Sequence, residues 1–159
     1  SIVGFTGDRA RVVGSVRDLV KAVKGASRVG LLSQTTQSLA AFKEVVAKLL
    51  DLVPEVRIFN TICHAASDRQ EAAKVLSRKV DMAIVVGGKV SANTGQLVSI
   101  FRRAGIKTYH VEGKEELKKC RFNGHKRIGI IAGASTPDWI TKDLIDFFKN
   151  KNRKGGINT

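Results

Sequence analysis

A cysteine in a polar turn is the first residue of this sequence that is placed to do chemistry. Cys63 lies in the segment NTICHAA at 60–66, after an apolar run at 56–59 and before a pattern typical of a helix. A packing thiol belongs in an apolar run, whereas a thiol at a strand-to-helix turn can contact a ligand or a metal. The other cysteine, Cys120, lies in a basic segment with no second thiol nearby. Because there is no C-x-x-C pattern, we expect no complete cysteine metal site within this chain.

Turns rich in hydroxyls, amides and glycines follow other apolar runs. They lie at 33–36, 87–94 and 132–136, and each precedes a helical pattern. One such turn is usually only a helix cap. Several at equivalent places indicate an anion site, because helix N-termini offer free N–H groups and a positive dipole end. With no Walker A sequence and no G-x-G-x-x-G after a strand, the common nucleotide motifs are not supported. We therefore predict a phosphate-bearing ligand of another kind.

The elements that must position these turns alternate along the chain. Short apolar runs predict strands at 29–32, 56–59, 82–86, 107–111 and 128–131. Helical spacing predicts helices at 39–53, from 67 onward, around 97–101, at 115–119 and from 137 to about 149. Ser67 and Gln70 predict a capping box, and Thr136 with Pro137 predicts the start of the last helix. This alternation predicts an α/β fold with parallel sheets, whose carboxyl-end loops gather on one side and bind the ligand.

The composition is that of a globular protein with excess positive charge. Its 159 residues suffice for one ordinary domain or two small ones. Twenty-eight Lys and Arg against 14 Asp and Glu give a net charge of +14, which favours nucleic acid or a phosphorylated small molecule as partner. No apolar run approaches the roughly 20 residues that cross a bilayer, so no membrane partner is expected. Two cysteines indicate a reducing compartment, the cytoplasm first and a plastid second.

Four motifs, in this order and spacing, resemble one enzyme family. SQTT at 33–36, TICHAASDRQEA at 61–72, VVGGKVSANTGQL at 85–97 and AGASTPDW at 132–139 are similar to 4-hydroxy-3-methylbut-2-enyl diphosphate reductase. That family is the iron–sulfur oxidoreductase of the last step in the methylerythritol phosphate route to isoprenoids. The resemblance extends from about residue 4 to residue 149. It implies two consecutive parallel-sheet α/β lobes of a three-lobed enzyme, the first lobe being incomplete.

The resemblance also implies roles for particular residues. Cys63 matches one of three cysteines that hold a [4Fe-4S] cluster, whose fourth iron is free to take the substrate's terminal oxygen. A thiolate suits a helix-opening turn, because the backbone dipoles there favour its charge. Thr35 would lie near the reacting end of the substrate and serve catalysis by orienting a water or proton relay. The positions that match diphosphate-binding residues are Ser91, Ala92 (through its backbone N–H), Asn93 and Ser135.

Part of the enzyme that the resemblance implies lies outside this sequence. The family's other cluster cysteines, its substrate-binding histidines and a catalytic glutamate belong to an N-terminal region that has no match here. We expect a partial middle lobe at 1–59, a third lobe at 60–150 and a basic flexible tail at 151–159. Such a chain is not expected to be active alone. It would need the N-terminal lobe, the diphosphate substrate and a ferredoxin- or flavodoxin-type electron donor.

A second class of function is left open by the charge. A basic, non-catalytic α/β module could bind nucleic acid or another polyanion. The sequence contains no helix-turn-helix, RNA-recognition or zinc pattern. Nucleic acid is therefore the weaker of the two hypotheses.

Overall fold

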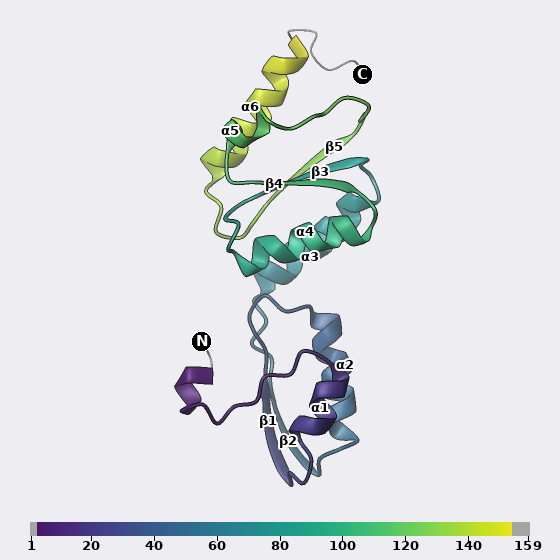
Figure 1. The fold of residues 1–159 in the computed structure, drawn as a ribbon, viewed down its shortest axis with the longest axis vertical. Helices are drawn as coiled ribbons and strands as arrows, with labels where there is room; N and C mark the ends of the chain where they lie inside the picture. The colour runs from purple at the N-terminus through teal and green to yellow at the C-terminus, as the bar shows by residue number, and fades with distance from the viewer. Residues whose placement is uncertain (1–2, 154–159) are drawn as a thin grey trace. The chain divides into compact units, whose positions relative to one another are not determined.

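Parallel strands alternate with helices throughout the chain. The computed structural model describes the backbone of residues 3–153 and the side chains of residues 3–150. Every strand pair it contains is parallel, and helices connect successive strands (Figure 1). The predicted α/β class is confirmed. The chain divides into two compact units, Ser1–Ile62 and Cys63–Thr159, where the sequence placed the boundary after residue 59.

The first unit is built on a two-stranded sheet. Its elements are η1 (Val3–Thr6), α1 (Val16–Ala22), β1 (Arg28–Leu32), α2 (Leu39–Leu50) and β2 (Glu55–Phe59). Ser15 and Ser38 cap the two α-helices by accepting hydrogen bonds from Asp18 N–H and Ala41 N–H. The buried core is made by Leu19, Val23, Leu49 and Val53. The sequence patterns did not predict η1 or α1.

The second unit has a three-stranded sheet in the order β4-β3-β5. Its strands are β3 (Met82–Val86), β4 (Lys107–Val111) and β5 (Ile128–Ala132). Its helices are α3 (His64–Ser77), α4 (Ala92–Arg103), α5 (Lys114–Leu117) and α6 (Asp138–Arg153). Figure 1 shows α3 and α4 on one face of the sheet, and α5 and α6 on the other.

The central strand β3 is buried on both faces, as its continuous apolar run predicted. Because side chains alternate between the faces of a strand, β3 supplies two separate cores. The core beneath α5 and α6 contains Met82, Ile84, Val86, Leu117 and Leu144. The core beneath α3 and α4 contains Ala73, Ala83, Val85, Leu97 and Phe101.

Several helix boundaries differ from the sequence prediction, most notably those of α3 and α6. The capping box at Ser67 is wrong: α3 begins at His64, and Cys63 is its N-cap residue. The N–H of Ser67 already donates to the Cys63 carbonyl at 3.0 Å, so Ser67 lies inside the helix. At the other end of the unit, α6 begins at Asp138 and continues to Arg153, so the first residues of the predicted flexible tail are helical. The rest of that tail, residues 154–159, lies outside the described residues.

Candidate anion-binding site

The three strands of the second unit end side by side. Val86 at the end of β3 pairs with Val111 of β4 and with Ala132 of β5. The loops that begin at residues 87, 112 and 133 therefore start at one edge of the sheet. Two backbone hydrogen bonds fix these starts, from Gly87 N–H to Val111 O at 3.0 Å and from Gly133 N–H to Val86 O at 2.8 Å.

Two glycines let the loop after β5 pack directly on the start of α4. A Cβ at Gly133 would lie 2.5 Å from the Thr94 hydroxyl oxygen. A Cβ at Gly87 would lie 2.8 Å from the hydroxyl oxygens of both Thr94 and Thr136, and the φ of Gly87 is +144°. The Thr136 hydroxyl donates to the Val86 carbonyl at 3.1 Å. The loop that contains Ser91 and Asn93 and the loop that contains Ser135 are thereby brought together.

The first turn of α4 carries an unusual buried amide. Ser91 is the N-cap residue, and its hydroxyl accepts a hydrogen bond from Thr94 N–H at 3.3 Å. Asn93 is only 7% exposed, yet neither its Oδ1 nor its Nδ2 has a hydrogen-bond partner among the described residues. Such a group costs free energy unless something hydrogen-bonds it. Ala92 and Ser135 are exposed. A buried, unpaired amide at a helix N-terminus is suited to an anion ligand.

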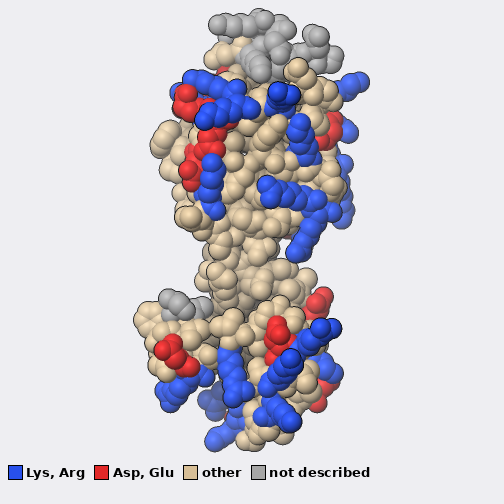
Figure 2. All heavy atoms as spheres, in the orientation of Figure 1, with Lys and Arg blue, Asp and Glu red and all other residues tan. Residues whose placement is uncertain are grey.

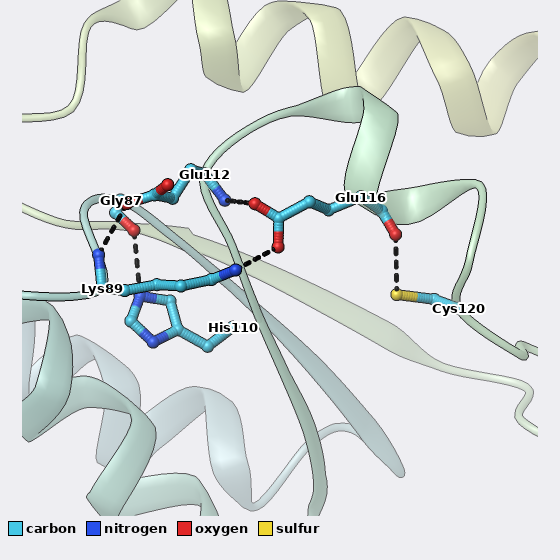
Figure 3. Close-up of polar contacts among 6 residues, drawn as sticks. All are labelled: Gly87, Lys89, His110, Glu112, Glu116 and Cys120. Atoms are coloured by element: carbon cyan, nitrogen blue, oxygen red, sulfur yellow. Dashed lines mark hydrogen bonds and ion pairs between the residues drawn. The ribbon is translucent and has the colours of Figure 1, made fainter.

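The lysine of this loop is held by carboxylates (Figure 3). Lys89 N–H donates to Glu112 Oε1 at 2.8 Å, and Lys89 Nζ donates to Glu116 Oε2 at 2.6 Å. That second bond raises the pKa of Lys89 and lowers the pKa of Glu116. His110 Nε2 lies 2.9 Å from the carbonyl oxygen of Gly87, at the start of the same loop. The loop is thus tied to β4 and α5 at two points.

The sequence analysis missed these supporting residues. Glu112 directly follows the strand at 107–111, so the rule that selected the other loops also selects this one. The loop was passed over because it lacks hydroxyls and amides. No local pattern could have found Glu116, because its contact with Lys89 joins residues 27 positions apart.

Cys63 lies at the same edge of the second unit by topology. The helix that it caps, α3, leads through a short turn into β3, and α4 follows β3 through another short turn. Both helices therefore run opposite to β3, side by side (Figure 1), with their N-termini toward the strands' carboxyl ends. Cys63 is exposed there.

Cys120 is in different surroundings. It is half-buried against the core beneath α5 and α6, and its Sγ donates to the Glu116 carbonyl at 3.4 Å. Burial raises the pKa of its thiol, and the charge of Glu116 raises it further. Within residues 3–153 there is no group of three or more His, Cys, Asp or Glu side chains placed to hold a metal ion. The described chain therefore does not fit a complete four-iron cluster, which needs several thiolates.

Thr35 belongs to the first unit and is exposed. Its turn is fixed by Thr61, which accepts a hydrogen bond from Ser33 N–H at 2.9 Å and donates one to the Ser33 carbonyl. The SQTT turn thus lies at the carboxyl ends of β1 and β2. The other predicted site residues belong to the second unit. That Thr35 converges with them stays a prediction.

The positive charge is spread over both units. On the face shown in Figure 2, Lys and Arg side chains are scattered over each unit, with Asp and Glu among them. Most ion pairs that the described residues form are exposed, such as Lys118 with Glu115. No described helix is long and apolar enough to span a membrane.

The fold and the loops define a class: a parallel α/β protein whose second sheet ends in glycine-containing turns and a helix N-terminus. The sequence profile of the LytB protein family matches residues 1–149. The chain belongs to this family, and the resemblance seen in its four motifs is confirmed.

Curated relatives carry the same enzyme name. A 4-hydroxy-3-methylbut-2-enyl diphosphate reductase of Aquifex aeolicus is 48% identical over 133 residues, which are 84% of this chain and 46% of that protein. The reductase of Geobacter sulfurreducens is 40% identical over 156 residues, 98% of this chain and 55% of that protein. The chain therefore spans about half the length of the curated relatives that it matches.

Two solved structures are similar to this chain. A structure of (E)-4-hydroxy-3-methyl-but-2-enyl diphosphate reductase, described as the terminal enzyme of the non-mevalonate pathway, is 43% identical, with a TM-score of 0.56 over 93% of this chain and 52% of that one. The reductase of Plasmodium falciparum gives a TM-score of 0.78 at 24% identity, covering 93% of this chain and 48% of that one, and supports the fold alone.

Proposed function

We propose that this chain forms the diphosphate-binding part of a 4-hydroxy-3-methylbut-2-enyl diphosphate reductase. The observation that carries the proposal is Asn93, a buried amide with both polar atoms unpaired at the N-terminus of α4. The hydroxyls of Ser91 and Ser135 and the N–H of Ala92 complete the cradle. The family match and the named relatives support the same reading. Nothing in them favours a nucleic-acid module.

The proposed reaction is a reductive dehydroxylation. Two electrons and two protons remove the substrate's hydroxyl as water and leave isopentenyl and dimethylallyl diphosphates. In this chain the cradle would hold the diphosphate, and Thr35 would orient a water or proton relay at the other end of the substrate. A ferredoxin- or flavodoxin-type protein would supply the electrons.

Cys63 is our candidate for one ligand of the [4Fe-4S] cluster. It is an exposed thiol at the N-terminus of a 14-residue helix, where backbone dipoles favour a negative ligand. The remaining ligands would come from residues that have no match in this chain. Because both cysteines are free, we propose a reducing cell interior as the location.

Calorimetric titration with inorganic pyrophosphate tests the cradle. Each lost hydrogen bond to a charged group is worth about 1.5–3 kcal/mol, so Asn93→Ala or Ser135→Ala should weaken binding about tenfold or more. Ser99→Ala is the matched control. Ser99 lies farther along α4 than the proposed cradle, and its hydroxyl donates to the carbonyl oxygen of Gly95 in the same helix. It should leave the affinity unchanged.

Salt dependence separates the cradle from general basicity. Exposed charges are screened over about 8 Å at physiological salt, so Lys43→Ala should matter little there. A polyanion-binding module would show the opposite result: affinity that falls steeply with salt and does not respond to Asn93→Ala. That outcome would sink the proposed function.

A further inference from the structure

We propose that Glu112 and Glu116 are positioning residues for the anion site, and that Lys89 serves the same purpose rather than contacting the anion. This inference rests on the proposed function. It assigns the carboxylates at the end of β4 and in α5 to holding the turn between β3 and α4, residues 87–91.

The contacts form a closed ring (Figure 3). Glu112 Oε1 accepts Lys89 N–H at 2.8 Å. The backbone N–H of Glu112 donates to Glu116 Oε1 at 3.3 Å, and Glu116 Oε2 accepts Lys89 Nζ at 2.6 Å. Backbone and side chain of Lys89 are thus both engaged, by two different carboxylates. Together these bonds fix the path of the backbone at residue 89, shortly after the end of β3.

The ring holds the part of the turn that directly precedes Ser91 and Asn93. Lys89 lies two residues before Ser91, whose N–H donates to Gly88 O at 3.0 Å. At the start of the turn, His110 bonds the carbonyl of Gly87 at 2.9 Å. The turn is therefore held at Gly87 and at Lys89 before α4 begins, so Ser91 and Asn93 are set in place before a ligand arrives. Preorganised donors bind an anion without the cost of ordering.

The sign of the charge makes the proposal testable. Carboxylates close to an anion repel it, so electrostatics alone predicts that removing Glu112 or Glu116 tightens anion binding. Removing Glu116 would also release the Lys89 ammonium. If Lys89 were an anion ligand, this release would tighten binding as well. A positioning role predicts the reverse, weaker binding after removal of a negative charge.

The experiment is titration of the full chain with inorganic pyrophosphate, with a thermal melt of each variant. Lys89 and Glu116 are partly exposed, with side chains 54% and 33% accessible. Allowing for solvent, Glu112→Ala and Glu116→Ala should each weaken binding about three- to tenfold. Glu112→Gln keeps an oxygen acceptor for Lys89 N–H and should retain affinity within about twofold. This rescue would not occur if the carboxylate acted only through its charge.

A double substitution tests Lys89 directly. Lys89→Ala in the Glu116→Ala background should add little, because residues in one hydrogen-bonded network do not act independently. A large extra loss would show that Lys89 contacts the anion and would overturn its assignment.

Glu115 provides the matched control. It is the adjacent carboxylate in α5, and it pairs with Lys118 rather than with the turn. Glu115→Ala removes the same charge and should leave binding equal or slightly tighter. Unchanged or tighter binding in both Glu112→Ala and Glu116→Ala would overturn the positioning role while the proposed function stands. If the unaltered chain fails to bind pyrophosphate, both fall.

Discussion

The two cysteines differ in exposure and in hydrogen bonding, although neither belongs to a C-x-x-C pattern. Cys63 caps α3 and is exposed, whereas Cys120 is half-buried and donates its S–H to a backbone carbonyl. The position of a thiol in a turn or in a packed segment thus decides what it can bind. Of the two thiols, only that of Cys63 is exposed.

We expect this difference to be visible in alkylation. At pH 8, iodoacetamide should modify Cys63 about tenfold faster than Cys120, since the thiolate is the nucleophile. Burial raises the pKa of Cys120, so a smaller fraction of it is ionised at that pH. Peptide mapping by mass spectrometry over a time course measures both rates. In urea, which unfolds the protein, the two alkylation rates should become similar. Equal rates in the folded protein would contradict the difference in exposure between Cys63 and Cys120.

At the scale of elements, the start of α4 is the feature on which the site depends. It is packed from one side by the loop after β5 and held from the other by β4 and α5. Thr94, only 1% exposed, is the contact between α4 and the loop after β5. The proposed cradle would therefore depend on close packing of backbone as much as on polar side chains.

Gly133→Ala should break this packing. The new Cβ would lie 2.5 Å from the hydroxyl of Thr94, which is buried, so we expect a loss of about 1–3 kcal/mol in the free energy of unfolding. Urea unfolding followed by far-UV circular dichroism measures this loss.

Gly95→Ala, in α4, is the matched control. Nothing lies within 4 Å of its added Cβ, and it should stabilise the unit by about 0.5–1 kcal/mol through helix propensity. Equal destabilisation by both substitutions would show that the close approach at Gly133 is not a special constraint.

At the scale of the whole molecule, the part of the chain that the structure describes has no group of three or more His, Cys, Asp or Glu side chains that could hold a metal ion. Its first unit carries Thr35, and its second unit carries Cys63 and the cradle. Each unit has its own core, yet the chain spans only about half of its curated relatives.

The isolated chain should not hold a stable four-iron cluster. It offers one exposed thiol, whereas such clusters are held by several thiolates. Anaerobic reconstitution with iron and sulfide, followed by iron counting and a visible spectrum, measures the outcome. Cys120→Ser should change nothing. A content of about four irons per chain that is lost on Cys63→Ala would point to ligands that we have not identified.

Much of this fold could be predicted from the sequence, because the signals are local. The apolar run at 82–86 predicted the doubly buried strand β3, and the strand–turn–helix alternation predicted parallel sheets. The motif loops and the placement of Cys63 in a turn could also be predicted from the sequence. These features depend on side-chain periodicity and on glycine, proline and hydroxyl positions within a few residues.

Tertiary structure alone decided how the loops support one another. The ring of Lys89, Glu112 and Glu116 joins segments more than 20 positions apart, and the unpaired amide of Asn93 follows from burial by neighbouring elements. The start of α3 at His64, rather than at the capping box, was likewise decided outside local sequence preference. Sequence patterns specify which residues reach the edge of a sheet. Which of them meet there depends on strand register and close packing, which no local pattern encodes.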